Sequence, residues 1–318
     1  MNRDQLLEFY EQGYRNFMGV DLAGTDLSGV MLIGVNLRGA NLIGTNLSRT
    51  FLTKSDLRET ALNWANLSFA KMSEVNLSQA NLTKANLSGA FMVKSRLIDT
   101  QLSGANLANT NLRAASLLGA NLCSAKLPKI NLRQANLNHT NLKWADLRQG
   151  RLTGAQLQGS QLMGVNLSQT FLIDVDLSST DLRGIDFSQA RLTRANLSNC
   201  NLSYANLAAA QLRNANLNCA NLTSANLTAC QLKGGNLDHA NLSGANLTDT
   251  DLSYSSLKEA NLNGVDLTYT DLTNADVEAA VFDPTFAAHI LANPSNFFRP
   301  SSTAETRTYS ASPQIKFA

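Results

Sequence analysis

A hydrophobic residue recurs at every fifth position through most of this chain. Counting from Phe17 to Phe282 in steps of five gives leucine at 48 of 54 positions, with Phe, Met or Val at the others. The residue two places before each centre is usually small, and the residue just before it is Asn or Asp at 36 positions. No insertion interrupts this count, so the pattern predicts a repeat solenoid rather than a set of globular domains.

A period of five matches neither the 3.6-residue period of an α-helix nor the alternation of a β-strand. Leucines with this spacing would be spread over every side of either element. The chain must therefore turn once in each repeat. We expect the central leucine and the small residue two places earlier to point inward, while the other three positions face water.

The repeats, such as Ala-Asn-Leu-Thr-Lys at 80–84 and Ala-Asn-Leu-Thr-Ser at 220–224, resemble those of the pentapeptide-repeat family. The resemblance covers residues 15–284, and segment 6–17 is similar to the start of cyanobacterial members. It implies an all-β fold, a right-handed quadrilateral β-helix in which four repeats make one coil of 20 residues. The Asn or Asp before each centre is expected to bond to nearby backbone or to stack as a ladder.

The amino-terminal residues 1–14 are predicted to form a short capping helix. Leu6, Leu7, Phe9 and Tyr10 lie on this segment and are expected to close the first coil. A cap is needed because the apolar end of a solenoid otherwise pairs with other chains.

The repeat stops at Pro284, after which residues 285–292 are predicted to form a carboxyl-terminal cap and residues 293–318 a disordered tail. Several family members dimerise through the carboxyl end. The resemblance therefore implies a cap or a homodimer contact at Phe282, Phe286, Ile290 and Leu291.

Composition narrows the possible chemistry. Charged residues make up 16% of the chain and the net charge is +2, so an electrostatic function must come from local patches. The four cysteines show no metal-binding or disulfide spacing, which predicts free thiols in a reducing compartment. No secretory signal or long apolar run is present, which predicts a cytoplasmic protein without a membrane partner. The chain has no phosphate loop, nucleophile elbow or metal constellation, so we expect a non-enzyme without cofactor or metal.

The four faces implied by a coil of 20 residues differ in composition. Asn or Asp precedes the centre at 32 of 41 positions on three faces, but at only 4 of 13 on the face through Leu32. We call this the basic face, because it carries 10 of the 22 Lys and Arg residues of the repeat. With the interleaved phenylalanines, the candidate binding residues on it are Lys54, Lys71, Lys94, Arg113, Arg133, Arg151, Arg191, Arg194, Arg213, Lys233, Phe51, Phe91 and Phe171.

Charge also changes along the chain. Residues 82–152 carry a net +8 and residues 238–283 a net −8. Between the coils of Leu52 and Leu232, Glu74 and Asp174 are the only acidic residues on the basic face.

Three functions remain open. The leading hypothesis is a non-catalytic scaffold or regulatory adaptor, in which the basic face of a rigid rod binds another protein with an acidic surface. Some family members inhibit DNA gyrase by resembling duplex DNA, but only the acidic end near Asp251, Asp266, Asp271 and Asp276 fits that alternative. Nucleic-acid binding by the basic face is the third, and it predicts affinity that falls with salt. If the protein has no partner, the basic face is an ordinary solvent-exposed surface without a binding role.

Overall fold

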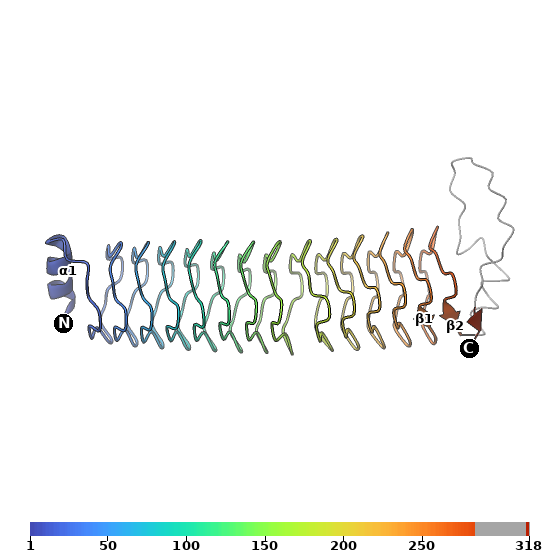
Figure 1. Cartoon of the computed structure of the whole chain (residues 1–318), viewed down its shortest axis with the longest axis horizontal. Helices are drawn as coiled ribbons and strands as arrows, with labels where there is room; N and C mark the ends of the chain where they lie inside the picture. Colours follow the sequence, from blue (N-terminus) through green and yellow to red (C-terminus); the bar gives the residue numbers. More distant parts are fainter. Residues whose placement is uncertain (284–315, 318) are drawn as a thin grey trace, which may run out of the picture. The chain divides into compact units, whose positions relative to one another are not determined.

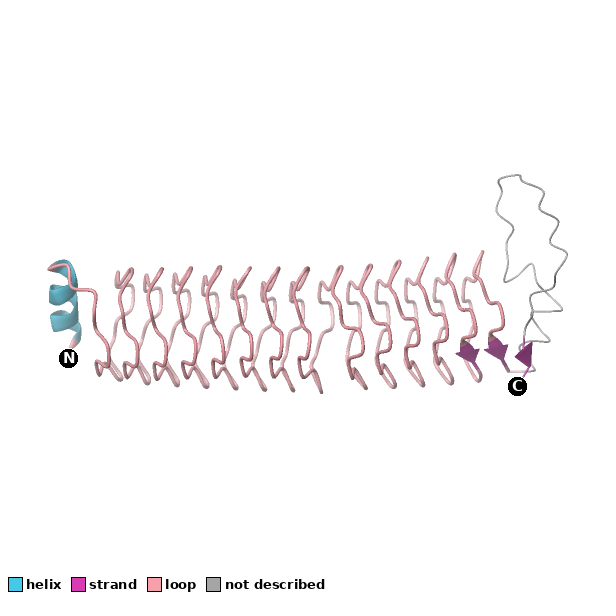
Figure 2. Ribbon diagram, in the orientation of Figure 1, coloured by secondary structure: helices cyan, strands magenta, loops and turns pink. Residues whose placement is uncertain are grey.

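The computed structural model describes residues 1–283 and Lys316–Phe317, and the chain divides into two units, Met1–Asn166 and Leu167–Ala318. Each unit contains a stack of square coils (Figure 1). The helices and strands of the described residues are α1 (Arg3–Glu11), β1 (Asn261–Leu262), β2 (Val281–Phe282) and β3 (Lys316–Phe317). Almost everything else is turn and irregular backbone, as Figure 2 shows.

The coils pair in parallel at a fixed register. Within each unit the isolated bridges join residues 20 positions apart, as in Met31 with Phe51 and Arg191 with Gln211. This register confirms four repeats per coil, and the chain folds as the predicted right-handed quadrilateral β-helix. Each side pairs through a single residue because the chain turns again after five residues, so few bridges lengthen into strands. The exceptions form one parallel sheet in the order β1-β2-β3.

Every repeat ends in a turn with one left-handed residue. The second residue after each centre has positive φ at every fifth position from Gly19 to Ala279, and 37 of these residues are not glycine. A positive φ at this place, with a bond such as Thr25 N–H to Leu22 O at 3.1 Å, defines a type II turn. The left-handed conformation costs about 1–2 kcal/mol in a non-glycine residue. Hydrogen bonds to the neighbouring coil offset this cost.

The inward positions form a continuous apolar core within each unit. The central leucines are buried almost completely, and so are most of the small residues two places earlier. Where a buried small residue is Thr or Ser, its hydroxyl donates to the backbone, as Thr45 Oγ1 does to Leu22 O at 2.9 Å. Among the described residues, no buried side-chain nitrogen or oxygen lacks a hydrogen-bond partner. The predicted inward and outward positions are thus confirmed.

The Asn and Asp residues complete the backbone hydrogen bonding. In a regular repeat, four of the five N–H groups donate to backbone of the same or a neighbouring coil. The fifth belongs to the residue just after the centre, and the Asn or Asp side chain accepts it. Ser28 N–H donates to Asp26 Oδ1 at 2.9 Å in this way. The same side chains stack between coils, as Asn66 Nδ2 donates to Asn46 Oδ1 at 3.1 Å, so their predicted structural role is confirmed.

Helix α1 covers the first coil, as predicted. Asn2 and Gln5 form a capping box at its start, and Leu6 is fully buried. The prediction for Phe9 was wrong. Its side chain is 40% exposed because it lies on the outer side of the helix, in edge contact with Tyr14.

At the other end, Phe282 is buried in β2. The predicted cap at 285–292, with Phe286, Ile290 and Leu291, lies outside the described residues. Of the predicted disordered tail, the structure describes only Lys316 and Phe317, which form β3. The homodimer contact stays a prediction.

Candidate interaction surface

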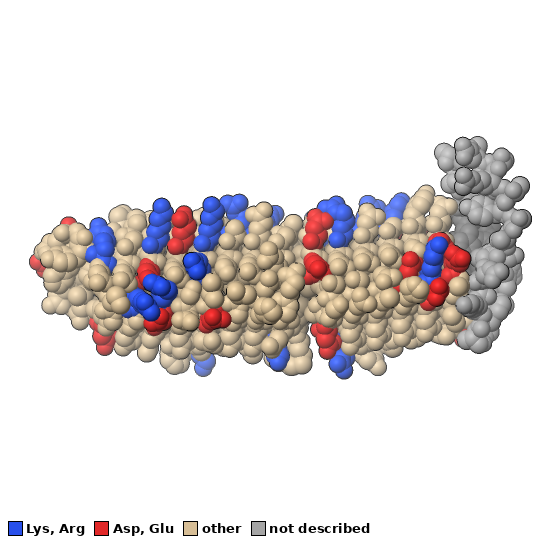
Figure 3. Space-filling model, in the orientation of Figure 1, with Lys and Arg blue, Asp and Glu red and all other residues tan. Residues whose placement is uncertain are grey.

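The basic face of the first unit is one continuous column. Parallel bridges join, in order, Met31, Phe51, Lys71, Phe91, Asn111, Asn131 and Arg151. The six predicted cations of this unit, Lys54 through Arg151, are all exposed. In the described part of the chain, none of the six forms an ion pair with a carboxylate. Figure 3 shows Lys and Arg along the upper edge of this unit, interrupted by acidic residues.

Aromatic rings are interleaved with these cations, as the sequence predicted. The Lys71 ammonium lies over the Phe91 ring, 5.9 Å from its centroid. Phe51 and Phe91 are 39% and 41% exposed, which is high for an apolar side chain of this size. The column therefore offers both charge and apolar surface.

The remaining predicted cations belong to the second unit. Arg191 lies over Phe171, at 4.7 Å from the ring centroid, and Lys233 lies over Tyr254 at 4.9 Å. Arg194 differs, because its guanidinium holds Asp174 with a shortest separation of 2.6 Å.

The ion pair between Arg194 and Asp174 shifts the pKa of both groups. Hydrogen bonding to Arg194 lowers the pKa of Asp174, and the carboxylate raises the pKa of the Arg194 guanidinium. The Arg194 guanidinium is therefore already paired with a carboxylate of the same chain. Arg191, Arg213 and Lys233 are the exposed cations of this unit's basic face that form no ion pair within the described residues.

Sequence reasoning missed a set of backbone donors on the first unit's basic face. Phe51, Lys71 and Phe91 stand where other faces have Asn or Asp, so they cannot accept the following N–H. The N–H groups of Thr53, Ser73 and Val93 consequently have no acceptor among the described residues. At Asn111 and Asn131 the usual bond is present, as Arg113 N–H donates to Asn111 Oδ1 at 3.2 Å. The missing Asn residues were themselves the signal that could have revealed these donors.

At the top of the column, helix α1 supplies the missing acceptor. Met31 replaces the usual Asn or Asp, and Ile33 N–H donates instead to the Tyr10 hydroxyl at 3.2 Å. The guanidinium of Arg15 stacks on the Tyr10 ring at 3.8 Å and holds it in place. An oxygen that does not belong to the repeat can thus reach this N–H position.

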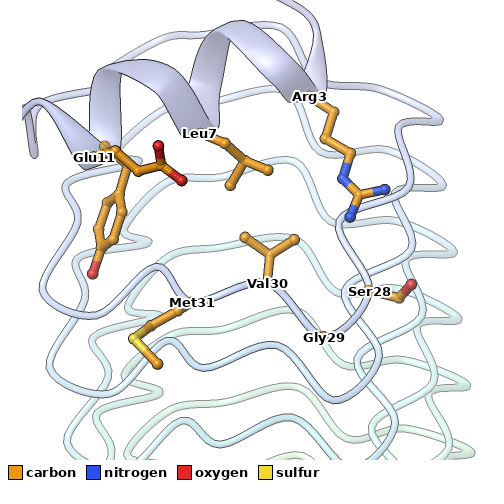
Figure 4. Close-up of a pocket in the computed structure, with 8 residues that line it drawn as sticks. Arg3, Leu7, Glu11, Ser28, Gly29, Val30 and Met31 are labelled. Atoms are coloured by element: carbon orange, nitrogen blue, oxygen red, sulfur yellow. The ribbon is translucent and has the colours of Figure 1, made fainter.

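A cavity of about 420 Å³ lies between α1 and the first coil. Figure 4 shows Leu7 above Val30, with Arg3 and Glu11 at opposite ends of the helix. Met31 also lines the cavity, so it adjoins the upper end of the column.

The thiols and histidines form no metal site within the described residues. Burial raises the pKa of the Cys200 thiol to about 11 and that of the Cys230 thiol to about 12. His239 lies 3.6 Å from Glu259 without further ligands in the described residues, where no group of three or more His, Cys, Asp or Glu could hold a metal ion. Nor does the described part of the chain contain a helix long and apolar enough to cross a membrane.

Comparison with known proteins agrees with this geometry. A model of pentapeptide repeat regions matches residues 171–242, and a model of eight-copy pentapeptide repeats matches residues 16–59, 60–97, 95–122, 115–154 and 245–283. The chain belongs to the pentapeptide-repeat family. No curated protein matches its sequence.

Among solved structures, the chain is similar to HetL, which is involved in heterocyst differentiation regulation in the cyanobacterium Nostoc sp. strain PCC 7120. Identity is 29%, coverage 89% of this chain and 97% of HetL, and the TM-score 0.21. Rfr23 from the cyanobacterium Cyanothece 51142 is 24% identical, over 52% of this chain and 96% of Rfr23, with a TM-score of 0.24. The plasmid-mediated fluoroquinolone resistance protein QnrB1 is 15% identical, over 88% and 97%, with a TM-score of 0.25.

Proposed function

We propose that this protein is a non-catalytic binding scaffold, and that the basic face of its first unit binds an acidic surface of another protein. One observation supports this most directly. Six exposed cations without ion pairs among the described residues follow one column, in which Phe51 and Phe91 replace the structural Asn at two of the seven positions.

A protein partner fits this face better than a nucleic acid does. Binding to single strands relies on aromatic faces that are free to stack on bases. Here the two rings of the column, Phe51 and Phe91, lie two coils apart with Lys71 between them, so they do not form a continuous stacking surface for successive bases. Acidic side chains and apolar groups of a protein can use the cations and the ring edges together.

The proposal is tested by capturing partners from a cell lysate with three forms of the protein. The first is wild type. The second reverses the charge of the basic face through Arg113→Glu, Arg133→Glu and Arg151→Glu. The third is a matched control on other faces of the same unit, with Lys84→Glu, Lys126→Glu and Lys129→Glu, all of them exposed. Circular dichroism first establishes that the variants fold.

We expect acidic proteins to bind wild type and the control but not the basic-face variant. Capture of the same proteins by all three forms would show that the basic face is ordinary solvated surface. Capture that disappears after nuclease treatment would instead favour nucleic-acid binding. Inhibition of gyrase supercoiling, lost when the acidic residues of 238–283 are neutralised, would favour DNA mimicry.

A further inference from the structure

We propose that the first unit's basic face binds partner carboxylates directly on the backbone N–H groups of Thr53, Ser73 and Val93. Lys54, Lys71 and Lys94 supply the charge around them. This inference rests on the proposed function and specifies its chemistry: the partner presents a row of Asp or Glu side chains, one for each coil.

The repeats themselves show that a carboxylate fits this donor. On other faces of the first unit, Asp21 Oδ1 accepts Ala23 N–H at 3.0 Å and Asp26 Oδ1 accepts Ser28 N–H at 2.9 Å. These acidic side chains approach from the outer side of the coil. At Thr53, Ser73 and Val93 the same donor is present in the same repeat geometry, and only an acceptor among the described residues is missing.

Tyr10 demonstrates that an acceptor from elsewhere can take this place. Its hydroxyl comes from α1, outside the repeats, and accepts Ile33 N–H. Ile33 stands one coil before Thr53 on the same face, so α1 fills the first position of the row. The next three positions have no such acceptor among the described residues.

The surrounding charges favour an anion over a neutral acceptor. Lys54 follows Thr53 and Lys94 follows Val93 directly, while Lys71 is two residues before Ser73. Glu74 is the single acid within these three coils of the face. Hydrogen bonds from N–H groups to carboxylates are roughly twice as strong as those to neutral acceptors, and nearby ammonium groups reduce the cost of desolvating the carboxylate.

The spacing indicates the conformation of the partner segment. Neighbouring coils are about 4.8 Å apart, as in any β-sheet. An α-helix presents one side chain per turn on a given side, about every 5.4 Å. An extended strand presents one about every 6.7 Å. Strand addition is also disfavoured, since the carbonyls along the face already accept N–H groups from the neighbouring coil. An acidic helix therefore matches the row best.

The decisive experiment separates the backbone donors from the charges. Phe51→Asn with Phe91→Asn supplies internal acceptors for Thr53 and Val93 while every cation is kept. Phe51→Ala with Phe91→Ala is the matched control, because it removes the same rings but leaves the donors open. The probe is a fluorescein-labelled helical peptide of alanine and glutamate with one glutamate per turn, and its affinity is measured by fluorescence anisotropy.

We expect the Asn variant to bind this peptide at least tenfold more weakly than the Ala variant, as the loss of two charge-assisted hydrogen bonds implies. Binding should also slow amide hydrogen exchange at residues 53, 73 and 93 of the wild-type protein. A peptide with glutamine in place of glutamate should not bind.

Equal affinities of the Asn and Ala variants, or unchanged exchange at these amides, would overturn the inference. It also fails if wild type does not bind the acidic peptide, or if a single-stranded oligonucleotide displaces the peptide at equal charge. None of these results alters the lysate capture, so the proposed function is judged separately.

Discussion

The Phe69 ring occupies the space that a side chain at residue 89 would need. A Cβ atom built on Gly89 would lie 2.6 Å from Phe69 Cε1, well inside van der Waals contact. The two residues hold the same turn position in consecutive coils, 20 residues apart. The large side chain of one coil thus leans over the next turn, which has room for it because that turn is glycine.

Gly89→Ala should therefore destabilise the protein by more than the ordinary cost of a left-handed alanine. That ordinary cost is about 1–2 kcal/mol. We expect an additional loss because the exposed Phe69 ring must move away from the new methyl group. Thermal unfolding followed by circular dichroism measures the effect.

Gly104→Ala is the control for this substitution. Gly104 also has positive φ, but a methyl group added to it would lie 3.7 Å from its nearest neighbour, Lys84 Cγ. Adding Phe69→Ala to Gly89→Ala should recover the difference between the two glycine positions. If both glycine substitutions lower the melting temperature equally, the clash between the Phe69 ring and the added methyl group does not affect stability.

The Asn ladder predicts a pair of opposite effects. Asn66 accepts Ser68 N–H at 3.2 Å and bonds to the ladder Asn on either side, so Asn66→Ala leaves a backbone donor unsatisfied and should cost about 1–3 kcal/mol. Ala61 is a natural gap in such a ladder. Ala61→Asn should supply an acceptor for the N–H two residues later and stabilise by about 1 kcal/mol. Chemical denaturation of both variants tests this, and a neutral result for both would contradict it.

We expect the free energy of unfolding to fall in acid as the Asp56 carboxylate becomes protonated. Its carboxylate accepts hydrogen bonds from the Arg58 guanidinium, which lowers the pKa of Asp56 in the folded protein. A lowered folded pKa means that this stabilisation is present above the unfolded pKa of about 3.9 and is lost as pH falls through the folded value. Asp56→Asn keeps an oxygen for Arg58 N–H but removes the charge.

The wild-type protein should accordingly be more stable than Asp56→Asn at neutral pH, and the difference should vanish at low pH. Melting temperatures of both forms across this range provide the measurement. A difference that persists unchanged below the folded pKa would show that the charge is not its source.

The cysteines should divide into two reactive and two protected thiols. Cys200 and Cys230 are buried, and their pKa values of about 11 and about 12 leave almost no thiolate at a pH of about 8. Cys219 is exposed and Cys123 partly so. Alkylation of the native protein followed by mass spectrometry should label Cys123 and Cys219, with all four labelled only after unfolding. Early labelling of Cys230 would contradict the described core.

The sequence by itself determined the repeat, the inward leucines, the four faces and the column of cations. A strict period of five requires the chain to turn once in each repeat if every leucine is to be buried. The family resemblance then implied a coil of four repeats, which places each residue over the one 20 positions later. The helix over residues 3–11 could also be predicted, since a solenoid end needs a cover.

Only the tertiary structure decided which polar groups are satisfied. Side-chain directions between coils decide that Arg194 pairs with Asp174 and that Lys71 lies over Phe91. They also decide that the Tyr10 hydroxyl reaches Ile33 N–H. Composition shows that Thr53, Ser73 and Val93 follow residues without an acceptor. It does not show that their N–H groups remain open, because that depends on what the rest of the chain brings within hydrogen-bond distance.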